Sequence, residues 1–453
     1  MKLADISPIF KKKNNLLKEN YRSVNVLTIL SKVFERILCD QMLIYFENIF
    51  SSNISAYRNG YNCQHVLLQL TEHWRKALDN DEYVGTLSMD LSKAFDCMPH
   101  ALLIAKLNAY GLSFNACNLV ISYLKNRHQR VKIINEFSEW SVINRGVPQG
   151  SVLGPILFNI FVNDLFYIEI KSHIANYADD NNLYHSDKSL DELVCTIQKD
   201  TCVTVDWCVQ NGMHPNTEKF QCTIMNRSGN IQTDITIHDN TIPSSDHITV
   251  LGVKLDAKLS FDLHISDIVK RASKQINVLR RISKYLDEKS RKNVYTTFIS
   301  ANFNYCPVAW MFCRKKNSIK LEKLQERALR FVYNDTFSSY SDLLKKGNFL
   351  SLSAYRIYFL GVEVFKSKRN MNPAYINQLF HSRNIPYQLR DRNKYDQSTF
   401  NTIKYGFKSF SYYGASLWNK LPVCIKESEN LYIFKNKLKD WCRTEACAKL
   451  EIC

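Results

Sequence analysis

Two groups of aspartates fall where short strands are expected to end. Asp90 follows the apolar segment VGTLSM, and Asp179 and Asp180 lie in the polar centre of YADDNNL. If the two strands are neighbours, Asp90 and Asp179 face one another and could hold two divalent cations about 3.5–4 Å apart, as in-line phosphoryl transfer requires. Mg²⁺ suits such a site because it takes few carboxylates and keeps water and phosphate oxygens as its other ligands. Aspartate is also a common turn residue, so the spacing alone equally fits a solvated hairpin tip.

The segments around the aspartates predict the elements that position them. Strands are expected at residues 84–89 and 220–225, and hairpins at 131–142, at 174–184 with its tip at the aspartates, and at 249–253 with 259–263. Apolar residues recur at helical spacing over residues 24–50, 63–78, 100–125, 152–165 and 190–210. This order predicts an α+β fold with an antiparallel sheet.

The charge of the chain is unevenly distributed. The 453 residues carry a formal net charge of +17. Residues 1–255 have a net charge of −2, whereas residues 256–345 carry +9 and residues 346–453 carry +10. A local positive excess indicates a polyanionic partner. We therefore expect a catalytic half at 1–255, a basic helical region at 256–345 and a basic C-terminal region at 346–453.

Composition excludes several other classes of protein. With 45% hydrophobic and 23% charged residues the chain is expected to be globular, and it has no apolar run long enough for a membrane span. An intracellular location, in the nucleus or cytoplasm, is therefore expected, with no membrane partner. The cysteines are expected to be free thiols. The groups Cys195, Cys202, Cys208 and Cys442, Cys447, Cys453 lack the paired C-x₂-C spacing of a zinc site.

Three segments in order carry a more specific signal: LSMDLSKAFDCMPH (87–100), RGVPQGSVLGPILFNIFVNDL (145–165) and ANYADDNNLY (175–184). They resemble motifs A, B and C of reverse transcriptases from non-LTR, LINE-type retrotransposons. Residues 8–38 and 56–68 resemble the finger motifs, 212–222 motif D and 251–261 the primer-gripping hairpin. FSYYGASLWNKLP (410–422) resembles a C-terminal segment of jockey-like and chicken-repeat-like elements. The resemblance thus covers nearly the whole chain.

The resemblance implies a role for each matching residue. Asp90, Asp179 and the backbone carbonyl of Leu91 match metal ligands, and Asp180 matches the second aspartate of the same box. Phe95 matches the steric gate, where an aromatic ring would clash with a 2′-hydroxyl; taken alone, it would be read as a core phenylalanine. Lys219 matches a general acid for the departing pyrophosphate. The positions expected to contact the incoming deoxynucleotide are Arg22, Arg58, Gln149 and Gly150.

The resemblance also implies a right-hand polymerase with fingers, a palm, a helical thumb and a mostly α-helical basic C-terminal region. The cofactor would be two Mg²⁺ ions, or Mn²⁺, and the partners an RNA template, a DNA primer and dNTPs. The thumb-like helix would contact nucleic-acid phosphates through Lys270, Arg271, Lys274, Arg280 and Arg281. A second basic run at 314–330 is also expected to be helical. The aromatic residues of 405–418 could stack on unpaired RNA bases, but burial in a helical core is the stronger expectation.

Some features depart from the family pattern. Ser23 and Asn25 replace the usual residues of the first finger motif, and residues 60–63 read GYNC in the second. Members normally carry an N-terminal endonuclease, which this chain is expected to lack, so another chain would supply the nick. The leading hypothesis is an RNA-directed DNA polymerase, a nucleotidyltransferase that extends a DNA 3′-OH. The alternative is a catalytically silent or domesticated nucleic-acid-binding remnant; a palm-fold nucleotide cyclase is disfavoured by the segment resembling motif B.

Overall fold

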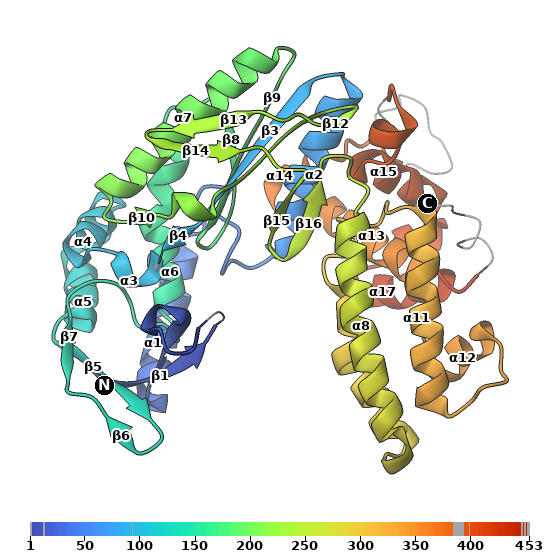
Figure 1. The fold of residues 1–453 in the computed structure, drawn as a ribbon, viewed down its shortest axis with the longest axis horizontal. Helices are drawn as coiled ribbons and strands as arrows, with labels where there is room; N and C mark the ends of the chain where they lie inside the picture. Colours follow the sequence, from blue (N-terminus) through green and yellow to red (C-terminus); the bar gives the residue numbers. More distant parts are fainter. Residues whose placement is uncertain are drawn as a thin grey trace.

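The strand that precedes Asp90 lies at the centre of a five-stranded sheet in the computed structural model (Figure 1). The strand order is β12-β11-β3-β9-β8, and every neighbouring pair is antiparallel. These strands are β3 (Tyr83–Met89), β8 (His173–Tyr177), β9 (Asp180–Asp187), β11 (Gln221–Asn226) and β12 (Gly229–Asn230). The structure describes residues 2–450 except 12–13, 93, 384–393, 398, 445–446 and 448–449.

Helices cover both faces of this sheet, which is why β3 is apolar almost throughout. On one face lies α7 (Leu190–Gln210), which packs so closely that a Cβ at Gly85 would lie 3.2 Å from the Ile197 side chain. On the other face lies α2 (Cys63–Asp79), where the indole Nε1 of Trp74 donates to Thr86 Oγ1 at 2.8 Å. A strand enclosed on both faces must bury successive side chains, and it therefore loses the alternation typical of a half-exposed strand.

The first 170 residues add a second five-stranded sheet and a helical layer, which form the left limb of the arch in Figure 1. The sheet has the order β2-β1-β5-β6, and β7 also pairs with β5. Its strands are β1 (Leu3–Phe10), β2 (Tyr21–Val26), β5 (Arg127–Ile133), β6 (Glu136–Phe137) and β7 (Ser141–Ile143). The helices are α1 (Ile29–Phe46), α3 (Ala94–Cys97), α4 (His100–Ala109), α5 (Phe114–Leu124) and α6 (Gly154–Val162). They share a core that contains Phe46, Leu103 and Phe158.

The right limb begins after two hairpins, β13 (Asp234–Ile237) with β14 (Asn240–Pro243) and β15 (His247–Val250) with β16 (Val253–Asp256). Its long helices are α8 (Asp262–Ile282), which borders the gap of the arch in Figure 1, and α11 (Lys315–Tyr333), which packs beside α8. Shorter helices complete it: α9 (Glu288–Val294), a π-helical turn at Tyr295–Ile299, α10 (Ser300–Asn304) and α12 (Tyr340–Gly347). One core joins α2, α8 and α11 through Trp74, Ile276 and Leu329.

The C-terminal region packs its own helices around Phe365, Trp418 and Phe434. These helices are α13 (Leu352–Lys368), α14 (Ala374–Asn377), α15 (Phe410–Lys420), α16 (Val423–Lys426) and α17 (Leu431–Trp441). The aromatic residues Tyr405, Phe410, Tyr413 and Trp418 are at most 5% exposed. The expectation of burial in a helical core is confirmed for Phe410, Tyr413 and Trp418, whereas Tyr405 is buried in the core that contains α2 and α8.

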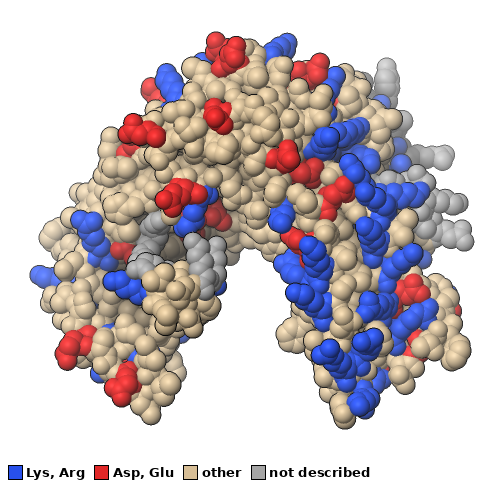
Figure 2. All heavy atoms as spheres, in the orientation of Figure 1, with Lys and Arg blue, Asp and Glu red and all other residues tan. Residues whose placement is uncertain are grey.

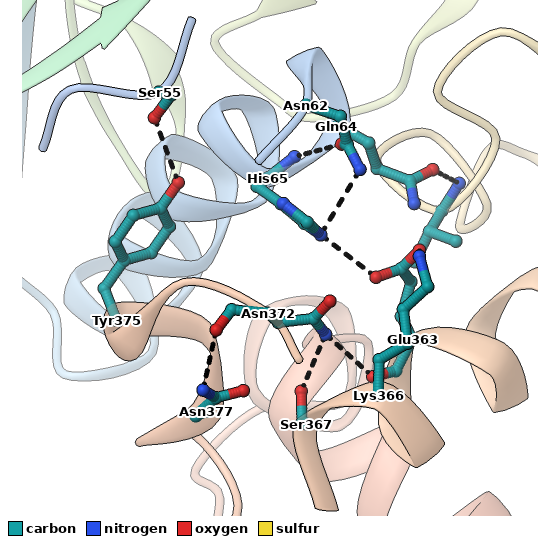
Figure 3. Close-up of polar contacts among 11 residues, drawn as sticks. Ser55, Asn62, Gln64, His65, Glu363, Lys366, Ser367, Asn372, Tyr375 and Asn377 are labelled. Carbon is teal, nitrogen blue, oxygen red and sulfur yellow. Dashed lines mark hydrogen bonds and ion pairs between the residues drawn. The ribbon is translucent and has the colours of Figure 1, made fainter. Parts of the chain in front are cut away.

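Buried polar contacts tie the C-terminal region to α2 and to the loop before it. His65 Nε2 of α2 lies 3.0 Å from Glu363 Oε2 of α13, and Ser55 Oγ of the preceding loop lies 3.3 Å from the Tyr375 hydroxyl of α14 (Figure 3). Farther along α2, Glu72 accepts the Phe410 and Ser411 N–H groups, which open α15. A carboxylate is favourable at a helix N-terminus because the first amides have no partner within the helix. The C-terminal region is thus anchored on the helix that backs the central sheet.

Several predicted boundaries are wrong. The segment expected to be helical from residue 24 begins as β2, and the one expected over 100–125 divides into α4 and α5. The predicted partner of residues 249–253 is also wrong, because the hairpin closes between Val250 and Val253. Leu251 and Gly252 both have positive φ, as a two-residue hairpin turn requires. Residues 259–263 instead lead into α8. No helix of the described residues is long and apolar enough to cross a membrane.

Candidate active site

The sheet brings Asp90 next to the turn that carries Asp179 and Asp180. Met89 pairs with Asn181, so the residue after β3 lies beside the start of β9. Tyr177 pairs with Asp180, which leaves only Ala178 and Asp179 in the turn, and Ala178 has a φ of 54°. The three aspartates come from segments separated by almost 90 residues, and the antiparallel pairing of β3 with β9 joins them.

The carboxylates repel one another electrostatically. The Asp179 side chain still reaches solvent, but partial desolvation by the surrounding protein raises its pKa. The negative charge of Asp90 raises this pKa further. Burial raises the pKa of Asp180 to about 6, and the charges of Asp179 and Asp90 contribute. Neighbouring negative charges disfavour ionisation of one another, and a bound cation would relieve that repulsion.

Lys219 is the cationic partner of Asp90 in this structure. Its Nζ donates to Asp90 Oδ2 at 2.7 Å, and both side chains are about half exposed. The backbone around them is held by β10 (His214–Pro215), which pairs with β4 (Leu91–Ser92), and by the Asn216 N–H bond to the carbonyl of Asp90. Leu91 is 5% exposed and lies opposite Pro215. Asp90 and Lys219, which belong to different sequence motifs, thus form one ion pair.

Two cations from the N-terminal sheet face the same aspartates. The positive charges of Arg22, on β2, and of Lys11, just after β1, both act to lower the pKa of Asp179. Arg22 is exposed, and its strand position is opposite Ile9. Lys11 was not singled out by motif, although it begins the KKK run of the first finger segment. Positive charge beside a carboxylate cluster could accept the phosphates of a nucleotide.

Phe95 is held in a stack of aromatic rings. One face lies on Phe158 of α6, with ring centroids 4.4 Å apart and planes 20° apart. Tyr57 meets it at a right angle, with centroids 6.4 Å apart. Phe95 itself is only partly buried. The ring predicted to act as the sugar gate is therefore fixed by packing on one face, while part of its surface remains accessible.

The residues 145–150 are joined to the segment that carries Phe95. The Gly146 N–H donates to the Met98 carbonyl at 2.7 Å, and the Gln149 amide donates to Asp96 Oδ2 at 2.8 Å. Gly150 has a φ of 103°, and a Cβ there would lie 3.0 Å from the Asn25 carbonyl. The small size of Gly150 therefore accommodates β2 of the N-terminal sheet. A cavity of about 360 Å³ lies here, lined by Ser23, Asn25, Gln129, Arg145 and Pro148 among others.

Arg58 is not available at the surface in the way that the sequence suggested. Its guanidinium donates to the carbonyls of Ser51 and Ile54 and pairs with Glu47 at 2.9 Å. The residue is 8% exposed. In this structure the terminal nitrogens of Arg58 hold the loop that precedes α2, and its contact with the triphosphate stays a prediction.

The predicted thumb residues lie on one helix. Lys270, Arg271, Lys274, Arg280 and Arg281 are all exposed on α8, and none forms an ion pair with another described residue. Figure 2 shows the molecule as a deeply hollowed arch, with Lys and Arg side chains gathered over α8 and α11 on the right limb. Cation-rich walls concentrate a polyanion in the hollow.

The donor chemistry of the aspartates fits a hard divalent cation. Asp90 and Asp179 supply carboxylate oxygens, the ligands that Mg²⁺ prefers. Within the described part of the chain, no three His, Cys, Asp or Glu side chains are gathered closely enough to enclose an ion, and Asp90 is turned toward Lys219. Cys442 and Cys447 are buried in the C-terminal core, and Cys453 lies outside the described residues.

Comparisons with known proteins identify a family and several relatives of this chain. A sequence profile described as "Reverse transcriptase (RNA-dependent DNA polymerase)" matches residues 10–255. The chain is 27% identical over 334 residues to a probable RNA-directed DNA polymerase from transposon BS of Drosophila melanogaster, covering 69% of this chain and 36% of that protein. It is 26% identical over 330 residues to the RNA-directed DNA polymerase from mobile element jockey of the same species, with the same coverages.

The chain therefore spans little more than a third of the length of these two relatives. Among solved structures, apo telomerase from Candida tropicalis aligns with a TM-score of 0.44 and 11% sequence identity. That alignment covers 83% of this chain and 69% of the telomerase chain.

Proposed function

The chain belongs to the reverse transcriptase (RNA-dependent DNA polymerase) family, and we propose that it extends the 3′-OH of a DNA primer on an RNA template. The resemblance to jockey-like elements predicted from the motifs is confirmed by the relatives of this chain. The observation that carries the proposed activity is the meeting of Asp90, Asp179 and Asp180 at one end of the central sheet.

Asp90 and Asp179, with the Leu91 carbonyl, would hold two Mg²⁺ ions, or Mn²⁺. Bound there, the metals would acidify the attacking hydroxyl and neutralise charge on the triphosphate. Asp180 lies beside both carboxylates and adds negative charge to the site. Arg22 and Lys11 stand where their positive charges could orient the phosphates of the incoming nucleotide.

In the proposed reaction the primer 3′-hydroxyl loses its proton to water, its oxygen bonds to the α-phosphorus of a dNTP, and the bond from that phosphorus to the bridging oxygen breaks, so that pyrophosphate leaves. Lys219 would donate a proton to that departing oxygen. It must first leave Asp90, to which it is bonded at 2.7 Å. Phe95 would lie under the sugar and exclude a 2′-hydroxyl, and Gln149 and Gly150 would line the same pocket.

We assign residues 1–255 to fingers and palm, 256–345 to a thumb-like region and 346–453 to a basic C-terminal region. The right limb would hold the template and primer through the phosphate contacts of α8. An endonuclease or an already nicked target would supply the primer end. The reaction needs RNA and dNTPs, so its place would be the nucleus or the cytoplasm.

Primer extension tests this proposal. We expect dNTP incorporation on a primed RNA template with Mg²⁺, and loss of it in Asp179→Ala. Asp191→Ala, which removes an exposed aspartate at the start of α7, is the matched control and should incorporate normally. Equal rates for wild type and Asp179→Ala would refute the assigned site. Salt-dependent RNA binding without incorporation in any metal would favour the catalytically silent alternative.

A further inference from the structure

Tyr57 lies beside both Phe95 and Asp179, yet the sequence motifs assign it no role. Its ring meets the ring of Phe95 at a right angle, with centroids 6.4 Å apart. Partial burial raises the pKa of Tyr57, and the negative charge of Asp179 raises it further. The side chain is 49% exposed, whereas Ala56 before it is 0% exposed and Arg58 after it 8%. A single aromatic ring therefore projects from a buried loop toward the candidate site.

The backbone at Tyr57 is held in a costly conformation. Its φ is 60°, in the left-handed region that residues with a Cβ rarely adopt, and least often bulky residues. Such strain persists only where the surroundings impose it, and it is common at functional sites. The conformation turns the side chain of Tyr57 toward the site while the neighbouring residues stay buried.

The loop around Tyr57 is anchored on three sides. Ile54 forms a parallel bridge with Asn176 of β8, and the Ala56 carbonyl accepts the Asn159 side-chain amide of α6 at 2.8 Å. Ser55 Oγ lies 3.3 Å from the Tyr375 hydroxyl of α14, and the two side chains point at one another in Figure 3. The central sheet, α6 and the C-terminal region together fix the position from which Tyr57 projects.

We propose that Tyr57 is a specificity-determining residue, whose ring forms the second aromatic wall of the deoxynucleotide pocket and keeps Phe95 oriented against a 2′-hydroxyl. The inference rests on the proposed polymerase function. Phe158 already confines one face of Phe95, with ring centroids 4.4 Å apart. Tyr57 adds a contact at a right angle to the Phe95 ring. Loss of the Tyr57 ring would let Phe95 tilt away and leave room for the ribose hydroxyl.

Two substitutions separate the ring of Tyr57 from its backbone. Tyr57→Phe keeps the ring, whereas Tyr57→Asn removes it but tolerates positive φ. We expect Tyr57→Asn to melt no lower than wild type, because it relieves the strained conformation. It should raise the KM for dNTP with little change in kcat and lower the preference for dNTP over rNTP about tenfold, the upper end of an aromatic contact. Tyr57→Phe should restore wild-type values.

A binding measurement separates this inference from the proposed function. The affinity for the next dNTP or rNTP is measured on a chain-terminated primer annealed to RNA, where no chemistry is needed. Tyr432→Asn, at an exposed tyrosine of α17, is the control. Wild-type discrimination in Tyr57→Asn, or its loss in Tyr57→Phe, would overturn the role given to the ring. A wild type that discriminates in binding but never incorporates would refute the polymerase proposal and leave the role of Tyr57 standing.

Discussion

Lys219 Nζ donates to Asp90 Oδ2 at 2.7 Å, so a candidate general acid and a candidate metal ligand are bonded to one another. A divalent cation that binds Asp90 through Oδ2 would compete with the ammonium group. Displacement would free Lys219 at the moment when the triphosphate and its metals arrive. Under the proposed mechanism, the pair would link nucleotide and metal binding to the release of a proton donor.

Breaking this pair should affect metal binding and turnover in opposite directions. In Lys219→Gln we expect Mn²⁺ to bind about two- to fivefold more tightly, the range of a solvent-exposed ion pair. Incorporation should nevertheless slow, because the proton donor is gone. Calorimetric Mn²⁺ titration and single-turnover kinetics measure the two effects. The matched control is Lys254→Gln, which breaks the Lys254–Asp267 pair of 2.8 Å at the start of the right limb. Unchanged Mn²⁺ affinity in Lys219→Gln would show that the pair does not compete with the metal.

The exposed cations of α8 should determine how strongly salt weakens nucleic-acid binding. Replacing both Lys270 and Lys274 with Gln removes two of the proposed phosphate contacts. The slope of log K against log salt should then fall by about 1.8 for a duplex, taking 0.9 per contact. Fluorescence anisotropy of a labelled RNA–DNA duplex over a salt series measures it. Lys188→Gln, an exposed lysine beyond β9, should leave the slope unchanged. An equal drop in that variant would assign the effect to net charge alone.

The hydrogen bonds of the Asp79 carboxylate should make the protein less stable in acid. Its carboxylate accepts the N–H groups of Asn401 and Thr402 and the Thr402 hydroxyl, at 2.7–2.9 Å. Burial acts to raise the pKa of Asp79, but these hydrogen bonds outweigh it and lower the pKa below 3.8. A carboxyl whose pKa is lower in the folded than in the unfolded protein stabilises the fold fully at pH values above the unfolded-state pKa. This stabilisation is lost as the pH falls through the folded-state pKa.

The stability that the Asp79 carboxylate contributes should therefore begin to fall just below pH 4. Asp79→Asn should cost about 1–3 kcal/mol near neutral pH, as expected for hydrogen bonds to a charged group. The difference between variant and wild type should shrink toward pH 2. Melting temperatures measured from pH 2 to 7 test this prediction. A difference that stays constant across the range would mean that the carboxylate charge contributes nothing.

The buried pair of His65 and Glu363 should be essential to the docking of the C-terminal region. Glu363 is 5% exposed, His65 is fully buried, and Lys366 Nζ lies 3.1 Å from Glu363 Oε1. Glu363→Ala should destabilise the protein by about 3–5 kcal/mol, because it leaves buried polar partners unsatisfied. A double-mutant cycle with His65→Ala, followed by chemical denaturation, should show strongly non-additive losses. Additive losses would mean that the two side chains are not coupled.

Much of the candidate site could be predicted because its residues lie next to one another in the chain. Asp90 and Phe95 share one segment, and the aspartate turn follows from a polar run between two apolar ones. The strand, the turn and the helix at 190–210 follow from local periodicity, which acts over a few residues. Hairpin register did not follow from it: β15 pairs with β16 across a two-residue turn, which depends on positive φ at Leu251 and Gly252.

The sequence alone determined the family, the three aspartates, the aromatic gate candidate and the placement of positive charge after residue 255. Only the tertiary structure decided which of these residues touch. It turned Arg58 inward to Glu47, bonded Lys219 to Asp90, and brought Tyr57 to Phe95 across 38 positions of chain. The physical reason is the range of the forces: propensity and patterning act along the chain, whereas packing and charge pairing act through space.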